Sequence, residues 1–158
     1  MSARAGIGYD VHRLIPGRPL VLGGVRFESP VGLEGHSDAD VVLHAIADAL
    51  LGAMALGDIG VHFPPGDPHW KDASSLDLLG RVAALVRARG GRPVHVDATL
   101  VAEAPRLGPH RDAMRANIAA ALGIEIERVS IKATTNEGLG AIGRGEGIAA
   151  WAVASVEA

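Results

Sequence analysis

The sequence predicts one α+β domain over residues 1–158, with a mixed or mostly antiparallel β-sheet covered on one face by helices. Three observations predict this fold class. Stretches with the apolar pattern typical of strands lie at 4–14, 94–102, 129–134 and 148–156. Apolar residues recur at helical spacing over 39–56, 74–89 and 109–122. No internal repeat, low-complexity tract or linker divides the chain.

The first strand is expected over residues 4–14, because apolar Ile7, Tyr9 and Val11 alternate with small or polar residues. A turn is expected at 16–19, where two prolines flank a glycine. Residues 20–27 are expected to form a hairpin with Gly23-Gly24 at its tip.

The first helix is expected over residues 39–56. Its apolar face is formed by Leu43, Ile46, Ala47, Leu50 and Met54. Ser37, followed three residues later by Asp40, resembles a capping box and predicts that Ser37 begins the helix. Residues 57–68 contain three prolines and three glycines, so we expect no regular structure there.

The second half of the chain continues with a helix at 74–89, which Gly90-Gly91 ends, and a strand at 94–102. A helix at 109–122 has Pro109 in its first turn and Gly123 just past its end. Strands at 129–134 and 148–156 follow. The last strand is apolar on both sides, which predicts that the bare face of the sheet packs against copies of the chain in a homo-oligomer.

Composition excludes several classes of function. The net charge of −3 and the absence of a Lys/Arg run argue against a nucleic-acid partner. No stretch of 18 apolar residues lacks charges, so we expect no membrane-spanning helix. The start of the sequence lacks the pattern of a secretory signal, which predicts a cytoplasmic location. Cysteine is absent, so a metal site must use His, Asp or Glu.

A candidate metal site is formed by Asp10, His12 and His44. Asp10 and His12 leave the same face of a strand, and His44 follows a polar cluster at the start of a helix. Two imidazoles and a carboxylate bind zinc and leave a fourth position open, as in catalytic sites. A structural role for the Asp-x-His pair is the alternative. Asp48, one turn beyond His44, is predicted to accept a hydrogen bond from a ligating histidine, unless it is an exposed helix residue.

Other polar segments have the character of a phosphate site. Residues 132–138 end a strand with two threonines and Glu137, whose carboxylate suits magnesium; a solvated turn is the alternative. Two prolines stiffen residues 102–109, and Asp58 lies between glycines that allow a ligand to approach. Residues 143–147 are rich in glycine but match neither the P-loop nor G-x-G-x-x-G. Together these segments indicate a metal-assisted reaction on a phosphorylated substrate.

Taken jointly, the motifs resemble the 2-C-methyl-D-erythritol 2,4-cyclodiphosphate synthase family of the non-mevalonate isoprenoid pathway. The resemblance covers essentially the whole chain. The segments that carry it are Gly6–His12, the run from Gly35 through His44 to Gly60 with Phe63-Pro64, Lys132–Thr135 and Gly143–Gly147.

The resemblance implies a homotrimer with active sites at the subunit interfaces. It implies that Asp10, His12 and His44 bind Zn²⁺, and that a second divalent cation, Mg²⁺ or Mn²⁺, lies near Glu137. His36 and Thr135 match catalytic positions that stabilise the transition state. The substrate would be 4-CDP-2-C-methyl-D-erythritol 2-phosphate, whose 2-phosphate attacks the β-phosphate and displaces CMP.

The resemblance also implies a set of substrate contacts. Cytosine would meet residues 102–108, largely through their backbone, and sugar or erythritol hydroxyls would meet residues 58–60. The substrate-binding residues carried over are Ser37, Asp58, Ile59, Gly60, Phe63, Asp67, Ala102, Pro105, Arg106, Leu107, Gly108, Ala133, Thr134 and Arg144. Phe63 would begin a mobile flap, and Arg144 would face a central channel that takes isoprenoid diphosphates.

One departure concerns the flap. The family commonly has an acidic residue directly after Phe-Pro, where this chain has Pro65, with Asp67 two positions further on. Two other readings of the sequence remain: a phosphohydrolase with a zinc-bound water, and a non-catalytic trimer that binds isoprenoid diphosphates through Arg144. CMP release without incorporation of solvent oxygen separates the cyclising enzyme from both.

Overall fold

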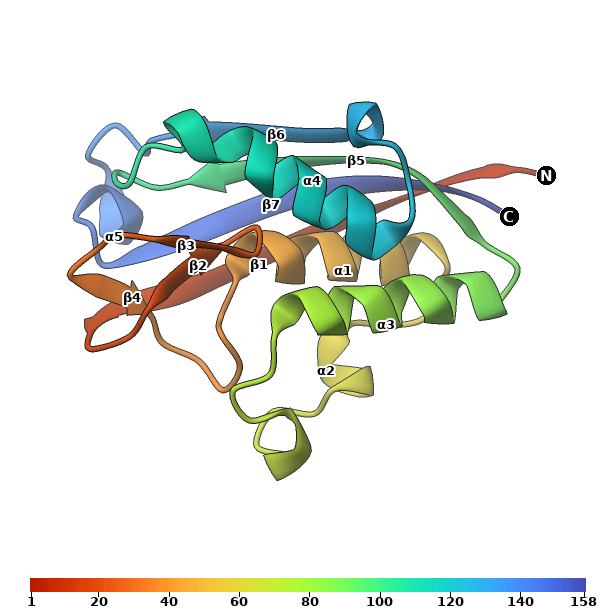
Figure 1. Cartoon of the computed structure of the whole chain (residues 1–158), viewed down its shortest axis with the longest axis horizontal. Helices are drawn as coiled ribbons and strands as arrows, with labels where there is room; N and C mark the ends of the chain where they lie inside the picture. Colours follow the sequence, from red (N-terminus) through yellow and green to blue (C-terminus); the bar gives the residue numbers. More distant parts are fainter.

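A five-stranded mixed sheet with helices on one face forms the body of the protein, as Figure 1 shows for the computed structural model of residues 1–158. The strand order is β4-β1-β7-β5-β6, and only β5 and β6 run parallel. The strands are β1 (Ala3–Pro16), β4 (Val31–Leu33), β5 (Arg92–Val101), β6 (Val129–Thr134) and β7 (Gly147–Glu157). A separate hairpin joins β2 (Leu20–Leu22) to β3 (Val25–Phe27). The predicted fold class is confirmed.

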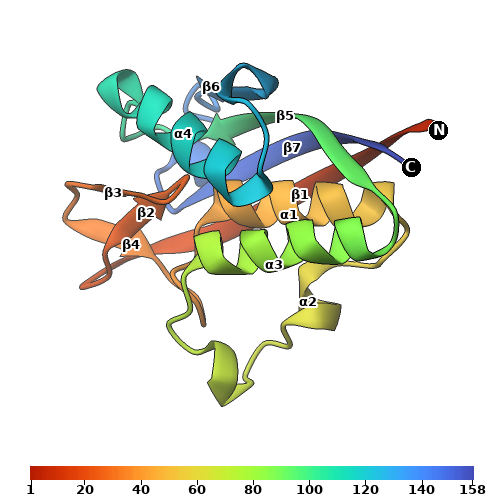
Figure 2. The ribbon, with the colours of Figure 1, turned by 45° about the vertical axis from the view of Figure 1, so that its right-hand side comes forward.

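Three long helices cover one face of this sheet: α1 (Val41–Ala53), α3 (Ser75–Ala88) and α4 (Arg111–Leu122) (Figures 1 and 2). Two glycines of β1 let α1 lie directly on the strand. A Cβ atom at Gly6 or Gly8 would lie 1.9 Å from the carbonyl oxygen of Ala49 or Ala45, respectively. The side chains of β1 that follow on the same face are Asp10 and His12. The close packing therefore brings the first turn of α1 next to both.

Helix α1 begins later than the sequence predicts, and Asp40 rather than Ser37 is its N-cap. The carboxylate of Asp40 accepts hydrogen bonds from the backbone N–H groups of Leu43, Gly23 and Gly24. The last two belong to the β2–β3 hairpin, so Asp40 joins the hairpin tip to the start of the helix. The Ser37 hydroxyl instead accepts from the Ala39 N–H. The prediction of a capping box at Ser37 was wrong because it could not include the hairpin donors.

The segment after α1 is more regular than predicted. Residues 57–68 contain a short helix, α2 (Ile59–His62), and a 3-10 turn, η1 (Pro68–Trp70), follows. Two carboxylates hold α2: Asp58 accepts from the Val61 N–H, and Asp48 accepts from the Ile59 N–H. Figures 1 and 2 show that the segment with α2 and η1 lies away from the sheet, beyond α1 and α3.

The later elements follow the predicted order. Helix α4 is shorter than the predicted 109–122, because Pro109 lies in a 3-10 turn, η2 (Gly108–His110). Gly123 ends α4 in the left-handed conformation, with φ of 67°, as its position past the helix predicted. A further 3-10 turn, η3 (Ile126–Arg128), precedes β6, and a short helix, α5 (Gly140–Gly143), precedes β7.

The opposite face of the sheet carries exposed apolar side chains. Ile7, Tyr9 and Val11 of β1 lie beside Trp151 and Val153 of β7, and each is between 45% and 67% exposed. The rings of Tyr9 and Trp151 are 4.5 Å apart. These side chains form one contiguous apolar patch, unlike the single apolar residues that are scattered over most protein surfaces. None of the helices combines the length and the apolar character that crossing a bilayer requires.

Candidate metal centre

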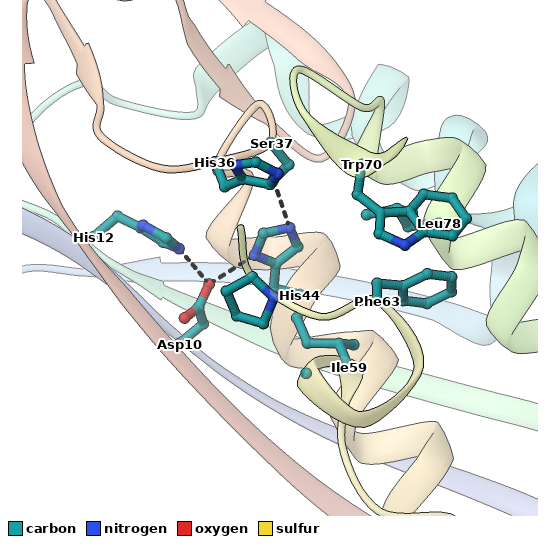
Figure 3. Close-up of a pocket in the computed structure, with 11 residues that line it drawn as sticks. Asp10, His12, His36, Ser37, His44, Ile59, Phe63, Trp70 and Leu78 are labelled. Carbon is teal, nitrogen blue, oxygen red and sulfur yellow. Dashed lines mark hydrogen bonds and ion pairs between the residues drawn. The ribbon is translucent and has the colours of Figure 1, made fainter. Parts of the chain in front are cut away.

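Three side chains that can bind a metal converge where β1 passes the start of α1. The Oδ2 atom of Asp10 lies 3.1 Å from Nε2 of His12 and 3.0 Å from Nδ1 of His44. One ligand atom from each residue lies within 4.8 Å of the other two. Figure 3 shows both rings directed at the carboxylate. Ligand atoms around a tetrahedral zinc ion lie about 3.3 Å apart, so the observed distances fit that ion.

The hydrogen bonds on the far sides of the rings support this assignment. The second ring nitrogen of His12, Nδ1, lies 2.6 Å from the carbonyl oxygen of Glu34. A carbonyl only accepts, so Nδ1–H donates, and Nε2, which faces Asp10, is the nitrogen left for a metal. The second nitrogen of His44, Nε2, lies 2.9 Å from the hydroxyl of Ser75 and 3.4 Å from that of Ser37. Metal-binding histidines characteristically make such outer contacts.

The charges of the cluster fit a cation. Burial raises the pKa of Asp10, but hydrogen bonds from His12 and His44 outweigh that effect and lower the pKa to about 2. The hydrogen bond to Asp10 raises the pKa of His12. The site therefore favours an ionised carboxylate next to positive charge, which a divalent ion supplies when it replaces the histidine protons.

A cavity of about 260 Å³ opens beside the cluster. Five residues that the resemblance implies as site residues line it together with the three candidate ligands: His36, Ser37, Ile59, Gly60 and Phe63. Sequence reasoning missed three further lining residues: Pro65, Trp70 and Leu78. Figure 3 shows Phe63, Trp70 and Leu78 on the side of the cavity away from Asp10 and His12.

The segment that follows α2 closes one side of this cavity. The rings of Phe63 and Trp70 meet edge to face at 4.9 Å, and the guanidinium of Arg81 lies 5.3 Å from the centre of the Trp70 ring. His36 Nε2–H donates to the carbonyl oxygen of Asp67 at 2.8 Å. The carboxylate of Asp67 accepts from the His69 N–H instead of facing the cavity.

The predicted role of Asp48 needs correction. Its carboxylate accepts from the Ile59 backbone, not from a ligating histidine. Burial raises its pKa. Asp48 thus holds the start of α2, and with it two residues that line the cavity, while Ser75 makes the outer contact to His44. The signal for Ser75 was absent from the local sequence, since it lies 31 residues beyond His44.

The remaining predicted site residues lie at the far strands of the sheet. In the register of the strands, Asp10 lies opposite Ala150, then Leu100, then Ala133. Three strand spacings separate Asp10 from Ala133, or about 14 Å. None of the residues from 102–108 or 133–137 lines the cavity beside the metal cluster. Within one chain, the predicted site is therefore split into two parts.

The second part has its own preorganised turn. The carboxylate of Glu103 accepts from the N–H groups of Asn136 and Gly138, and the Thr135 hydroxyl accepts from the Glu137 N–H. Thr134, Thr135 and Glu137 are exposed there. Pro105 lines a separate cavity of about 350 Å³.

The other predicted residues of this region differ in exposure. Ala102 and Leu107 are buried, so only their backbone can meet a ligand, whereas Arg106 and Gly108 are exposed. Arg144 lies at the end of α5 and pairs with Glu146, with Nε 2.5 Å from Oε2.

Comparison with known proteins decides the family. The model of the YgbB family matches residues 3–157. The chain belongs to the YgbB family. A 2-C-methyl-D-erythritol 2,4-cyclodiphosphate synthase of Symbiobacterium thermophilum is 66% identical over 96% of both chains. A synthase of the same name from Moorella thermoacetica is 63% identical and covers 95% of this chain and 92% of its own. The resemblance drawn from the sequence motifs is confirmed.

Solved structures of similar proteins agree with the fold. A CDP-bound 2C-methyl-D-erythritol-2,4-cyclodiphosphate synthase is 40% identical, with a TM-score of 0.89, over 98% of this chain and 100% of its own. The Plasmodium falciparum IspF in complex with CDP is 31% identical, with a TM-score of 0.86, over 98% and 96%. The bifunctional IspDF of Campylobacter jejuni is 41% identical, with a TM-score of 0.94. This chain, 98% of which is matched, spans 42% of that protein's length.

Proposed function

We propose that the single domain formed by residues 1–158 converts 4-CDP-2-C-methyl-D-erythritol 2-phosphate into 2-C-methyl-D-erythritol 2,4-cyclodiphosphate. An oxygen of the 2-phosphate forms a bond to the β-phosphorus, the bond from that phosphorus to the bridging oxygen breaks, and CMP leaves with this oxygen. The reaction class is that of a cyclising phosphorus–oxygen lyase. Family membership and the names of its close relatives support the reaction. The observation that carries its chemistry is the convergence of Asp10, His12 and His44.

The proposed metal ligands are those three side chains. A zinc ion held there would supply Lewis acidity toward a phosphate oxygen and would offset the negative charge that accumulates when two phosphates meet. The nucleophile is already an anion, so the chain needs no general base. Its main tasks are to bring two groups of one substrate into line and to keep them there.

Residues around the 260 Å³ cavity would carry out this positioning. His36 and Ser37 lie next to the metal cluster and would contact the phosphates, with His36 placed by its bond to the Asp67 carbonyl. The α2 segment would bind erythritol hydroxyls through Asp58, Ile59 and Gly60. The apolar wall that includes Phe63 would exclude water from the reacting groups.

The second part of the site would bind the nucleotide end of the substrate. Glu137 would hold Mg²⁺ or Mn²⁺ at the diphosphate, and Thr135 would contact the transition state. Ala133 and Thr134 would lie along the phosphates. Residues 102–108 would receive cytosine through backbone groups, in agreement with the burial of Ala102 and Leu107.

The distance between the two parts leads us to propose a homotrimer. If one chain supplies the metal cluster and its neighbour supplies residues 102–108 and 133–137, each active site lies at a subunit interface. The exposed face of Ile7, Tyr9, Val11, Trp151 and Val153 would then be buried between chains. In this arrangement Arg144 would line a central channel with affinity for an isoprenoid diphosphate. We place the enzyme in the cytoplasm.

The test is a turnover assay with zinc and magnesium in water enriched in ¹⁸O. The proposal predicts release of CMP and a cyclic diphosphate without solvent ¹⁸O, read by ³¹P NMR and mass spectrometry. A linear product that carries ¹⁸O would show a hydrolase instead, and no CMP at all would overturn the reaction. Asp10→Asn and His44→Ala should lose zinc and turnover, whereas the control Asp112→Asn, at an exposed helix position, should keep both.

A further inference from the structure

Two residues outside the predicted site make a continuous hydrogen-bond chain to the metal cluster. Nε2 of His44 lies 2.9 Å from the hydroxyl of Ser75, and that hydroxyl bonds in turn to the carboxylate of Asp38. Ser75 is 1% exposed and His44 is 9% exposed, so water competes little for these bonds. The three groups come from the loop before α1, from α1 itself and from the first turn of α3.

The direction of each bond follows from the chemistry of the carboxylate. An ionised Asp38 only accepts, so the Ser75 O–H must donate to it. The hydrogen of the serine is then engaged, and its oxygen can only accept from His44. His44 therefore carries a proton on Nε2, whereas its Nδ1, which lies 3.0 Å from Asp10 Oδ2, donates to that carboxylate until a metal replaces the Nδ1 proton.

Asp38 is itself fixed in place. Its carboxylate also accepts from the N–H groups of Ser75, at 3.0 Å, and Asp40, at 3.2 Å. The Ser75 N–H belongs to the first turn of α3, where the N-cap, Ser74, makes no side-chain bond. One carboxylate thus orients the Ser75 hydroxyl and satisfies a free N–H of the helix that carries it.

We propose that Ser75 and Asp38 are positioning residues that keep the remaining proton of His44 on Nε2, so that Nδ1 is the nitrogen that binds a metal. The inference rests on the metal site of the proposed function. Outer partners of metal-binding histidines fix ring orientation and tautomer in this way, and their loss costs 10–100-fold in metal affinity. In this chain the Ser75 hydroxyl lies between His44 and the carboxylate, so the direction in which each of the two hydrogen bonds is donated matters as much as their presence.

Asp38→Asn tests the direction of these two hydrogen bonds. The amide can donate to the Ser75 oxygen, which frees the serine hydrogen to point at His44 Nε2. His44 then protonates on Nδ1, the nitrogen that must bind the metal. Swapping a carboxylate for an amide behind a catalytic histidine is known to trap the wrong tautomer with little change in structure.

The experiment measures the tautomer and the zinc affinity without substrate. In zinc-loaded wild-type protein, ¹⁵N spectra of the histidines should show His44 protonated at Nε2 with Nδ1 bound to the metal, whereas Asp38→Asn at the same zinc concentration should keep a population protonated at Nδ1. Competition with a chelator should show zinc affinity about 10–100-fold lower in Asp38→Asn and Ser75→Ala. Ser74→Ala is the matched control, since Ser74 is the exposed neighbour without a side-chain bond, and its affinity should equal that of wild type.

Two results would overturn the proposal: a His44 protonated at Nδ1 in zinc-loaded wild-type protein, or zinc affinities in Ser75→Ala and Asp38→Asn equal to that of Ser74→Ala. If a variant fails to fold, the wild-type tautomer still decides the matter. Failure of the chain to release CMP would count against the proposed reaction. The tautomer of His44 and the zinc affinity test only the roles of Ser75 and Asp38.

Discussion

The close contact between β1 and α1 makes Gly8→Ala a direct test of what brings the three candidate metal ligands together. A Cβ atom at Gly8 would lie 1.9 Å from the carbonyl oxygen of Ala45 and 2.8 Å from its carbon. Ordinary contact needs about 1.5 Å more, and the obstacle is helix backbone, which cannot rotate away. Helix α1 must therefore move off the strand, and His44, adjacent to Ala45, moves with it.

The magnitude follows from that displacement. Overpacking a core typically costs 1–3 kcal/mol, and a clash with backbone belongs at the upper end, so we expect about 3 kcal/mol. For a chain of this size that corresponds to a melting temperature lower by about 6–12 °C. Zinc affinity should fall at least about tenfold, since His44 Nδ1 leaves its place 3.0 Å from Asp10 Oδ2.

Thermal unfolding of the metal-free protein and zinc competition are the assays. Gly52→Ala is the matched control, because Gly52 lies exposed in the same helix and a Cβ there meets no atom within 4 Å. It should raise stability by up to about 1 kcal/mol and leave zinc affinity unchanged. If Gly8→Ala matched Gly52→Ala in both measurements, close strand–helix packing would not be what places His44.

Three further predictions concern charge, the second part of the site and assembly. Since the pKa of Asp10 is about 2, below its usual 3.8, its ionised form stabilises the metal-free fold above pH 4, and that contribution disappears toward pH 2. Urea unfolding of wild type should lose about 2 kcal/mol relative to Asp10→Asn between pH 5 and pH 2, and a constant difference would contradict this. Glu103→Ala releases the N–H groups of Asn136 and Gly138, so turnover should need roughly tenfold more Mg²⁺; an unchanged magnesium titration would count against a role for this turn. Trp151→Asp places a charge on the exposed apolar face, so sedimentation should show single chains without turnover but with zinc still bound; active single chains would refute an interface site.

Local patterns in the sequence were sufficient where a feature depends on neighbours along the chain. The alternation of apolar residues placed Asp10 and His12 on one face of β1, and helical spacing predicted α1. That His44 would meet this pair followed from the types of the three residues and from the resemblance to the family. Gly123 past α4 likewise marks a helix end that needs no tertiary partner.

Features that depend on distant partners were out of reach. Asp40 became the N-cap of α1 because hairpin N–H groups, 16 and 17 residues earlier, also require its carboxylate. Helix α2 forms in a segment rich in proline and glycine because Asp48, 11 residues away, accepts from its first N–H. Ser75 contacts His44 although 31 residues separate them in the sequence. A serine at the start of a helix is common as a cap, so its presence there did not indicate a contact with a histidine.

The most direct test of the account is native mass spectrometry of the purified protein with a parallel metal analysis. We expect an assembly of three chains that carries one zinc per chain, and loss of that zinc in Asp10→Asn with the assembly intact. A single chain as the active species, or zinc retained in Asp10→Asn, would contradict the claim that Asp10, His12 and His44 form the metal site of an enzyme completed by its neighbours.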